Sequence, residues 1–263
     1  MRSPQEIVEY VNHSAYKKEK TPTKKLIILG IIAGVYISMG ALLSIIIGYG
    51  FPEAAKSNPA IIKLLMGATF PVGLIMIVLA GGELFTGCCA YFVPNVLSRR
   101  QRAKTMVKYC SIVWITNFIG ALLFGYFVVY LPHLSHYEPT IDGFMSIAQA
   151  KTSNPFYVTM LKGIGANWLV CLAMWLGMSS KSVTGKILGL WFPVMTFVAI
   201  GYEHSVANMF FLPIAMLEGF ELSVVELFTK NLIPATLGNI IGGTLFVGGV
   251  YWYLYDSKNS QKH

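Results

Sequence analysis

Charged side chains are scarce in this sequence. Only 12% of its 263 residues are Asp, Glu, Lys or Arg, whereas 55% are hydrophobic; a soluble domain carries about 25% charged residues. Uncharged runs extend over 26–52, 64–82, 84–98, 109–137, 163–180, 187–202, 204–217 and 231–255. Several of them exceed the roughly 18 residues that predict a membrane span. We therefore exclude a soluble core and interpret the chain as an integral, all-α membrane protein.

The motifs of enzymes and metal sites are missing as well. No HExxH, GxSxG or nucleotide-binding loop is present. The four cysteines form no CxxC pair or metal-ligand spacing and lie in apolar stretches, where helix packing explains them: Cys88, Cys89, Cys110 and Cys171. We expect no enzymatic activity, metal or cofactor. An intramembrane enzyme is the alternative, and a metal assay that finds stoichiometric zinc or iron would support it.

The positions of the basic residues indicate a topology rather than a nucleic-acid partner. The net charge is +8, and 15 of the 20 basic residues fall in alternate loops or tails: Arg2, Lys17, Lys18, Lys20, Lys24, Lys25, Arg99, Arg100, Arg102, Lys104, Lys108, Lys181, Lys186, Lys258 and Lys262. Because cytoplasmic loops collect Lys and Arg, both termini are predicted to be cytoplasmic, in a multi-pass protein of the inner (plasma) membrane. An even number of spans follows.

The N-terminal segment, residues 1–25, is polar and has no cleavable signal peptide. A capping box at Ser3 and Glu6 predicts a helix, and Ile7, Val8, Val11 and Ala15 share one of its faces. We expect this amphipathic helix to lie on the cytoplasmic membrane surface.

Two of the predicted spans are too long to be single straight helices. Residues 64–98 carry one charge, Glu83, and as one helix they would reach about 52 Å across a hydrocarbon core of about 30 Å. A helix broken around residues 81–83 resolves the excess. Residues 187–217 repeat the pattern, with Glu203 and His204 at the break. Non-helical backbone at membrane depth must be buried in protein or line a cavity, so two breaks indicate a permeation path.

An internal repeat accompanies the breaks. Residues 70–72 (FPV) recur at 192–194, Gly81 and Glu83 at 201 and 203, and Asn117 at 239, with offsets of 120–122. Each copy holds three spans, so the second enters from the opposite side, and two inverted three-helix repeats are predicted over 26–137 and 155–255. Residues 138–154 are an extracellular connection and 256–263 a cytoplasmic tail. Glu83 and Glu203 are expected to have a structural role, accepting the backbone amides that the breaks expose.

Three stretches resemble the formate/nitrite transporter family: residues 82–87 (GELFTG), 162–171 (KGIGANWLVC) and 201–209 (GYEHSVANM). The resemblance implies an aquaporin-like protomer in a homopentamer, in contact with membrane lipid, that passes a small anion and protons. It places His204 at the centre of the pore, facing Thr86. It further implies pore-side residues Lys162, Asn167 and Asn208, and constriction residues Phe70, Leu74, Leu84, Phe85 and Phe197.

The transported anion is less well specified. Formate is favoured by the context of residues 199–205 (AIGYEHS), with nitrite, hydrosulfide, and lactate or acetate with a proton as alternatives. A receptor or scaffold is disfavoured because it gains nothing from helix breaks at midplane. Acidic residues in one outside loop, Glu218, Glu221 and Glu226, are weak evidence for a cation channel.

Overall fold

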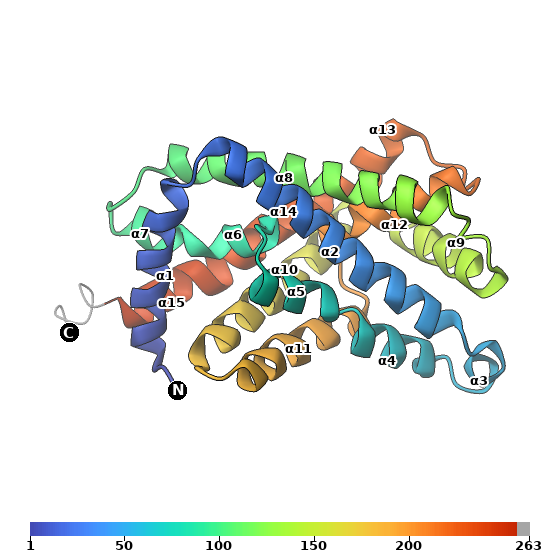
Figure 1. Cartoon of the computed structure of the whole chain (residues 1–263), viewed down its shortest axis with the longest axis horizontal. Helices are drawn as coiled ribbons and strands as arrows, with labels where there is room; N and C mark the ends of the chain where they lie inside the picture. The colour runs from blue at the N-terminus through green and yellow to red at the C-terminus, as the bar shows by residue number, and fades with distance from the viewer. Residues whose placement is uncertain (257–263) are drawn as a thin grey trace.

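The computed structural model describes residues 1–256, which contain helices and no strands (Figure 1). The predicted tail, 256–263, lies outside the described residues except for Asp256. The helices are α1 Pro4–Glu19, α2 Thr23–Tyr49, α3 Pro52–Ser57, α4 Ala60–Thr69, α5 Val72–Ala80, α6 Phe85–Tyr91, α7 Val93–Leu97, α8 Ala103–Phe124, α9 Glu138–Thr152, α10 Phe156–Ser179, α11 Val183–Ile200, α12 Ser205–Leu217, α13 Val224–Glu226, α14 Ile233–Gly243 and α15 Val250–Tyr255. Three π-helical segments are η1 Gly125–Tyr130, η2 Leu227–Leu232 and η3 Thr244–Gly249.

The six predicted spans are confirmed. In the described part of the chain six helical stretches are long and apolar enough to cross a membrane: Thr23–Tyr49, Ala60–Ala80, Ala103–Tyr130, Phe156–Ser179, Val183–Ile200 and Val224–Tyr255. Two shorter apolar helices, Phe85–Leu97 and Ser205–Leu217, follow the second and fifth of these. Helices α1 and α15 lie at one end of the bundle, while α3, α9 and α13 lie at the other (Figure 1).

Both predicted helix breaks are present. Helix α5 ends at Ala80 and α6 begins at Phe85, and α11 ends at Ile200 and α12 begins at Ser205. Gly81 (φ +101°) and Gly201 (φ +85°) open the two breaks. Only glycine adopts such backbone angles at low cost, so each break begins at the residue that permits the turn. The chain is also interrupted at Pro71, between α4 and α5, where the sequence did not predict a break.

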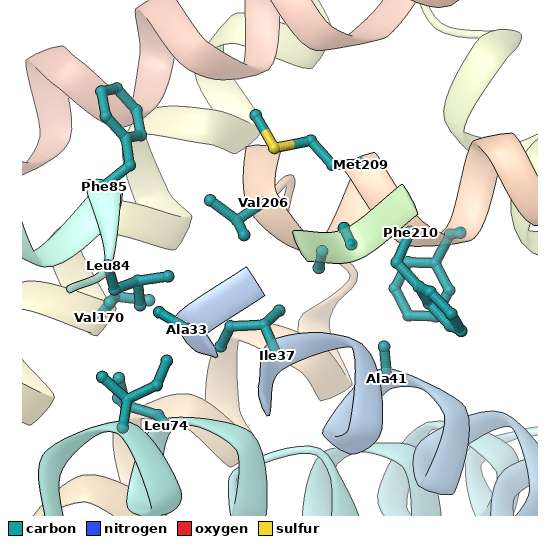
Figure 2. Packing of buried hydrophobic residues seen from close by; sticks show 14 of the residues in the cluster. Ala33, Ile37, Ala41, Leu74, Leu84, Phe85, Val170, Val206, Met209 and Phe210 are labelled. Carbon is teal, nitrogen blue, oxygen red and sulfur yellow. The ribbon is translucent and has the colours of Figure 1, made fainter. Parts of the chain in front are cut away.

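Pairs of spans approach closely through glycines. A Cβ on Gly34 of α2 would lie 2.1 Å from the carbonyl oxygen of Asn117 in α8. A Cβ on Gly238 of α14 would lie 2.1 Å from the carbonyl oxygen of Met160 in α10. Small residues at these crossings bring the backbones together as in other membrane bundles. Apolar side chains from α2, α5, α10 and α12 fill the space between the spans (Figure 2).

The structure corrects the expected position of the N-terminal helix. Helix α1 has its capping box at Ser3, but its apolar residues Ile7, Val8 and Val11 are buried against protein rather than available to lipid. The helix packs against α6, α7, α10 and α15. Polar contacts hold it there: the Asn95 side chain donates to a carbonyl of α1 (2.9 Å). The apolar face of α1 is thus covered by protein, and Asn95 of α7 supplies a polar partner that a lipid surface lacks.

Candidate functional site

A single asparagine holds the first helix break in place. Asn117 Oδ1 accepts the amide of Phe85 (2.9 Å), at the start of α6. Its Nδ2 donates to the carbonyls of Glu83 (2.9 Å) and Gly30 (2.8 Å). The side chain is fully buried. One residue therefore satisfies backbone groups that the broken helix leaves without partners, as the membrane interior requires.

Asn239 holds the second break in the same way. Its Oδ1 accepts the amide of Ser205 (2.9 Å), and its Nδ2 donates to the carbonyls of Glu203 and Gly163 (2.8 Å each). The expectation that the carboxylates of the two breaks accept these amides is thus corrected. An amide side chain offers an acceptor and two donors, whereas a carboxylate only accepts, so asparagine fits a site with an N–H and two carbonyls.

The two breaks meet at Thr86 and His204. Thr86 Oγ1 and His204 Nε2 lie 3.0 Å apart, although the residues are 118 positions apart in the chain. Both side chains are buried, with 0% of Thr86 and 2% of His204 exposed. Each residue stands at the start of the half-helix that follows its break. The sequence-based placement of these two residues opposite each other agrees with this geometry.

The histidine also caps the helix that follows it. His204 Nδ1 accepts the backbone amide of Ala207 (3.1 Å) at the first turn of α12. A nitrogen that accepts carries no proton, so this geometry fits the neutral tautomer with the proton on Nε2. That N–H points at the Thr86 hydroxyl, whose own proton is then left for another acceptor.

Aromatic rings cover one side of the histidine. Phe197 stacks on His204 with ring centroids 5.7 Å apart and an interplanar angle of 22°. Phe70 meets Phe197 edge to face at 5.8 Å. Both rings line a cavity of about 370 Å³ that also reaches His204. Aromatic side chains thus line this cavity directly beside the histidine.

This cavity, called the outer cavity below, is bounded by α4, α9, α10 and the second break and contains one buried carboxylate, Glu203. Glu203 Oε2 accepts from Lys151 Nζ (3.0 Å), Asn208 Nδ2 (2.6 Å) and Asn231 Nδ2 (3.2 Å). Asn208 Nδ2 also donates to Asn231 Oδ1 (2.7 Å). Lys63, Lys151 and Lys162 line the cavity with Glu203, so lysines outnumber carboxylates there.

A second cavity of about 430 Å³, called the inner cavity below, lies beyond the first break, at the end of the bundle where α1 packs. Leu74 and Leu84 lie in its wall next to the break. Glu83 forms an ion pair with Lys18 of α1, and Cys88 Sγ lies 3.7 Å from the same carboxylate. The two breaks therefore carry matching lysine–glutamate pairs, each with a lysine from a helix outside the broken spans.

The sequence matches one protein family over nearly its whole length. Residues 5–253 fit the profile of the formate/nitrite transporters. The chain belongs to the formate/nitrite transporter family. The relatives and solved structures that it resembles are transporters and channels, which sets the intramembrane enzyme aside.

Similar transporters come from distant organisms. A probable formate transporter of Methanothermobacter thermautotrophicus is 39% identical over 269 residues, covering 97% of each chain. The formate channel BtFdhC of Bacillus thuringiensis is 36% identical, covering 98% of this chain and 97% of the relative. The formate channel FocA of Escherichia coli K12 is 36% identical, covering 93% and 90%.

Solved structures of this family share the fold. An FNT family ion channel superposes with a TM-score of 0.83 at 28% identity, covering 95% of this chain and 98% of that one. A pentameric formate channel with formate bound superposes with a TM-score of 0.75 at 31% identity, covering 93% and 98%. The transporter is thus an all-helical membrane protein with the six-span fold of the family.

The predicted pore-side amides of the transporter are committed to protein partners. Asn167 Nδ2 donates to the carbonyls of Thr86 (3.1 Å) and Asn239 (2.6 Å). Asn208 Nδ2 donates to Glu203 and Asn231. An amide nitrogen has two hydrogens, so both are used in each case. The donor that this arrangement leaves for an anion is the Thr86 hydroxyl, because the Nε2–H of His204 already points at it.

The predicted constriction residues divide into separate groups. Phe70 and Phe197 line the outer cavity, while Leu74 and Leu84 line the inner one. Phe85 points away from Leu84 (Figure 2) and lines a lateral apolar cavity between α6, α8 and α14. Successive residues at the start of a helix project in different directions, so only Leu84 of this adjacent pair lies at the inner cavity.

Two site residues of the transporter were missed by the sequence analysis. These residues are Lys151 and Asn231. The lysine that the sequence analysis did place at the site, Lys162, lines the outer cavity but has no ion-pair partner among residues 1–256. The lysine that pairs with Glu203 is Lys151, from α9, a helix within the predicted connection. Asn231 comes from η2 in the last span. A π-helical segment often marks a functional position, but no sequence pattern indicated this one.

Proposed function

We propose that this protein conducts small monovalent anions, formate first, past a central pair formed by Thr86 and His204. The observation that carries the proposal is the 3.0 Å contact between these side chains, which joins the two helix breaks between two cavities lined by lysines. The names of the relatives, three of them formate transporters or channels, support formate over nitrite, hydrosulfide, lactate and acetate.

The charge distribution suits an anion. Both cavities hold more cationic side chains than carboxylates. Such clefts raise the local concentration of small anions before they meet the central constriction. The carboxylate in each cavity, Glu83 in the inner one and Glu203 in the outer one, is neutralised by a lysine, so neither repels the substrate. A cation channel would need the opposite arrangement.

The aromatic and aliphatic layers impose a desolvation cost. A bare anion between Phe70, Phe197 and Leu84 loses most of its hydration, which is expensive in a low-dielectric ring. A hydrogen bond from the Thr86 hydroxyl lowers this cost, and His204 Nε2 adds a second one where the anion takes the place of the threonine as its acceptor. Formate that takes up a proton becomes neutral and crosses the apolar layers more cheaply. Weak, neutral donors also release the ion again, as permeation requires.

Protonation of His204 is coupled to the backbone in this proposal. The imidazolium form would need a proton on Nδ1, which accepts the Ala207 amide. Adding that proton removes the cap and places a positive charge at the positive end of the α12 dipole. We therefore expect a change in the charge of His204 to rearrange the first turn of α12.

The functional test is anion flux into proteoliposomes across a pH series. We expect formate to pass faster than nitrite, hydrosulfide, acetate and lactate, with a pH dependence that changes in His204→Gln. Equal impermeability to all five anions would overturn the transport proposal. An unchanged pH profile in His204→Gln would overturn the role of the histidine alone.

Assembly and topology belong to the same proposal. A homopentamer is supported by the similar pentameric formate channel, and native mass spectrometry would test it. Cytoplasmic termini are supported by the clustering of basic residues near α1, α8 and α11; reporter fusions to each terminus would test them. Asn117 and Asn239 bind the backbone of the two helix breaks in the same way, and we call them the bracket asparagines. This correspondence supports two inverted repeats.

A further inference from the structure

The inner cavity is lined by parts of the chain that are distant in sequence. Its wall is formed by the N-terminal segment with α1, the start of α2, α5, the first break, α6, the end of α10 and the start of α11. Its volume of about 430 Å³ lies in the range of small-molecule sites, roughly 300–1,000 Å³. Formate, with three heavy atoms, would fill only a small part of it.

The wall of this cavity is strongly cationic. Four basic side chains line it, Arg2, Lys18, Lys25 and Lys186, against a single carboxylate, Glu83. The pairing of Lys18 with Glu83 leaves an excess of three positive charges around one cavity. These charges come from α1, α2 and α11, so the fold rather than one segment gathers them.

The three remaining cations are available to a ligand. Arg2 is fixed in place, because its Nη1 donates to the Met178 carbonyl (2.6 Å) and its guanidinium lies over the Tyr10 ring (4.7 Å). Neither Lys25 nor Lys186 has a carboxylate within ion-pair distance in the part of the chain that the structure describes. A fixed guanidinium with two free lysines is a favourable set for phosphate oxygens.

We propose that the inner cavity binds a phosphate-bearing anion with two or more negative charges, and that the bound anion obstructs transport. Coulomb attraction scales with the product of the charges, so three cations in the wall of one cavity hold a multivalent anion far more strongly than a monovalent one. A transported ion must bind weakly enough to leave. The excess charge therefore suits a resident ligand better than the permeating ion.

The position of the site explains the obstruction. The wall that carries the cations also contains Leu74, Leu84 and Gly82, next to the first break. An anion held between Lys25 and Lys186 would stand between the aqueous mouth and these residues. It would also link the N-terminal segment to α11 through Arg2 and Lys186.

Inorganic pyrophosphate is a suitable probe. Calorimetric titration of the detergent-solubilised full-length protein should show saturable binding. The double variant Lys25→Gln/Lys186→Gln should weaken it by about tenfold or more. Lys181→Gln, which removes an exposed lysine outside the cavity wall, is the matched control and should bind like the wild type. Unaltered binding in the double variant, or no binding to the wild type, overturns the proposal.

Formate flux in membrane vesicles of both orientations tests the obstruction, which rests on the proposed transport function. Pyrophosphate should inhibit when added to the face that carries α1 and not to the opposite face. Inhibition from both faces alike contradicts the site. The calorimetric result stands even if formate is not the substrate, so the two failures are distinguishable. Comparing vesicles with and without anionic phospholipid shows whether lipid headgroups or soluble phosphates occupy the site.

Discussion

His204 Nε2 lies 3.0 Å from Thr86 Oγ1, and this contact joins the two helix breaks through residues that are 118 positions apart in the chain. The histidine is fixed from its other nitrogen by the Ala207 amide, so it presents a defined donor to the threonine. The threonine hydroxyl accepts from the ring and can donate onward. The pair therefore behaves as one hydrogen-bonding unit at the narrow part of the proposed path.

Removing the threonine hydroxyl should slow transport without unfolding the protein. Thr86→Val keeps the size of the side chain but loses the donor, and we expect formate flux to fall by about fivefold, the effect of roughly 1 kcal/mol from one hydrogen bond. Thr86→Ser retains the hydroxyl and is the control, with flux near the wild type. Stopped-flow proteoliposome assays measure both. Equal flux in the two variants would mean that the hydroxyl has no part in transport.

The lysine–glutamate pair of the outer cavity should show strong coupling. Lys151→Met leaves the buried Glu203 carboxylate without its counter-ion, which repels anions and is costly to the fold. We expect at least a tenfold loss of flux. The double variant Lys151→Met/Glu203→Gln removes both charges and should recover much of it. Additive losses in this double-mutant cycle would contradict the coupling.

The bracket asparagines, Asn117 and Asn239, should contribute similarly to the thermal stability of the protein. Asn117→Leu or Asn239→Leu leaves a buried amide and two carbonyls without their partner, and each unsatisfied group costs about 1–3 kcal/mol. We expect a large fall in the thermal midpoint of the detergent-solubilised protein. Gln149→Leu, at an exposed position of α9, is the control and should melt like the wild type. A bracket variant that melts with the control would show that water replaces the asparagine.

Alanine variants at two glycines with positive φ should distinguish a loss of stability from a loss of transport. Gly201 (φ +85°) and Gly219 (φ +97°) both have open space where a Cβ would stand, so alanine costs only backbone strain, roughly 1–2 kcal/mol. Gly201 opens the second break, whereas Gly219 follows α12 outside it. We expect both alanine variants to lose stability and only Gly201→Ala to lose formate flux. Loss of flux in both would weaken the assignment of the break to the path.

Local features predicted much of the fold. The uncharged runs indicated the six spans, and the excess length of residues 64–98 and 187–217 indicated the breaks that the structure places after Ala80 and Ile200. The extra interruption at Pro71 was not predicted, and Pro193, its counterpart in the repeat, lies inside the continuous helix α11. Proline alone does not decide between a break and a continued helix, since packing around it does.

The site was predicted less completely. His204 and Thr86 were placed opposite each other through the family resemblance, and the structure brings them together. Lys151 was missed because α9 was interpreted as a connection, although its Phe144, Ile147 and Ala148 are buried. The role given to Glu83 and Glu203 at the backbone amides was wrong, because asparagines from other spans reach those amides.

The sequence alone therefore determined that the chain lies in a membrane, where its spans run and where two of them break. These properties depend on hydrophobic length and on glycine within a segment, which are local. Only the tertiary structure decided which lysine neutralises Glu203, which side chains satisfy the broken backbone, and that α1 packs on protein. Those choices are contacts between residues far apart in the chain, and partners of that kind follow from how the spans pack.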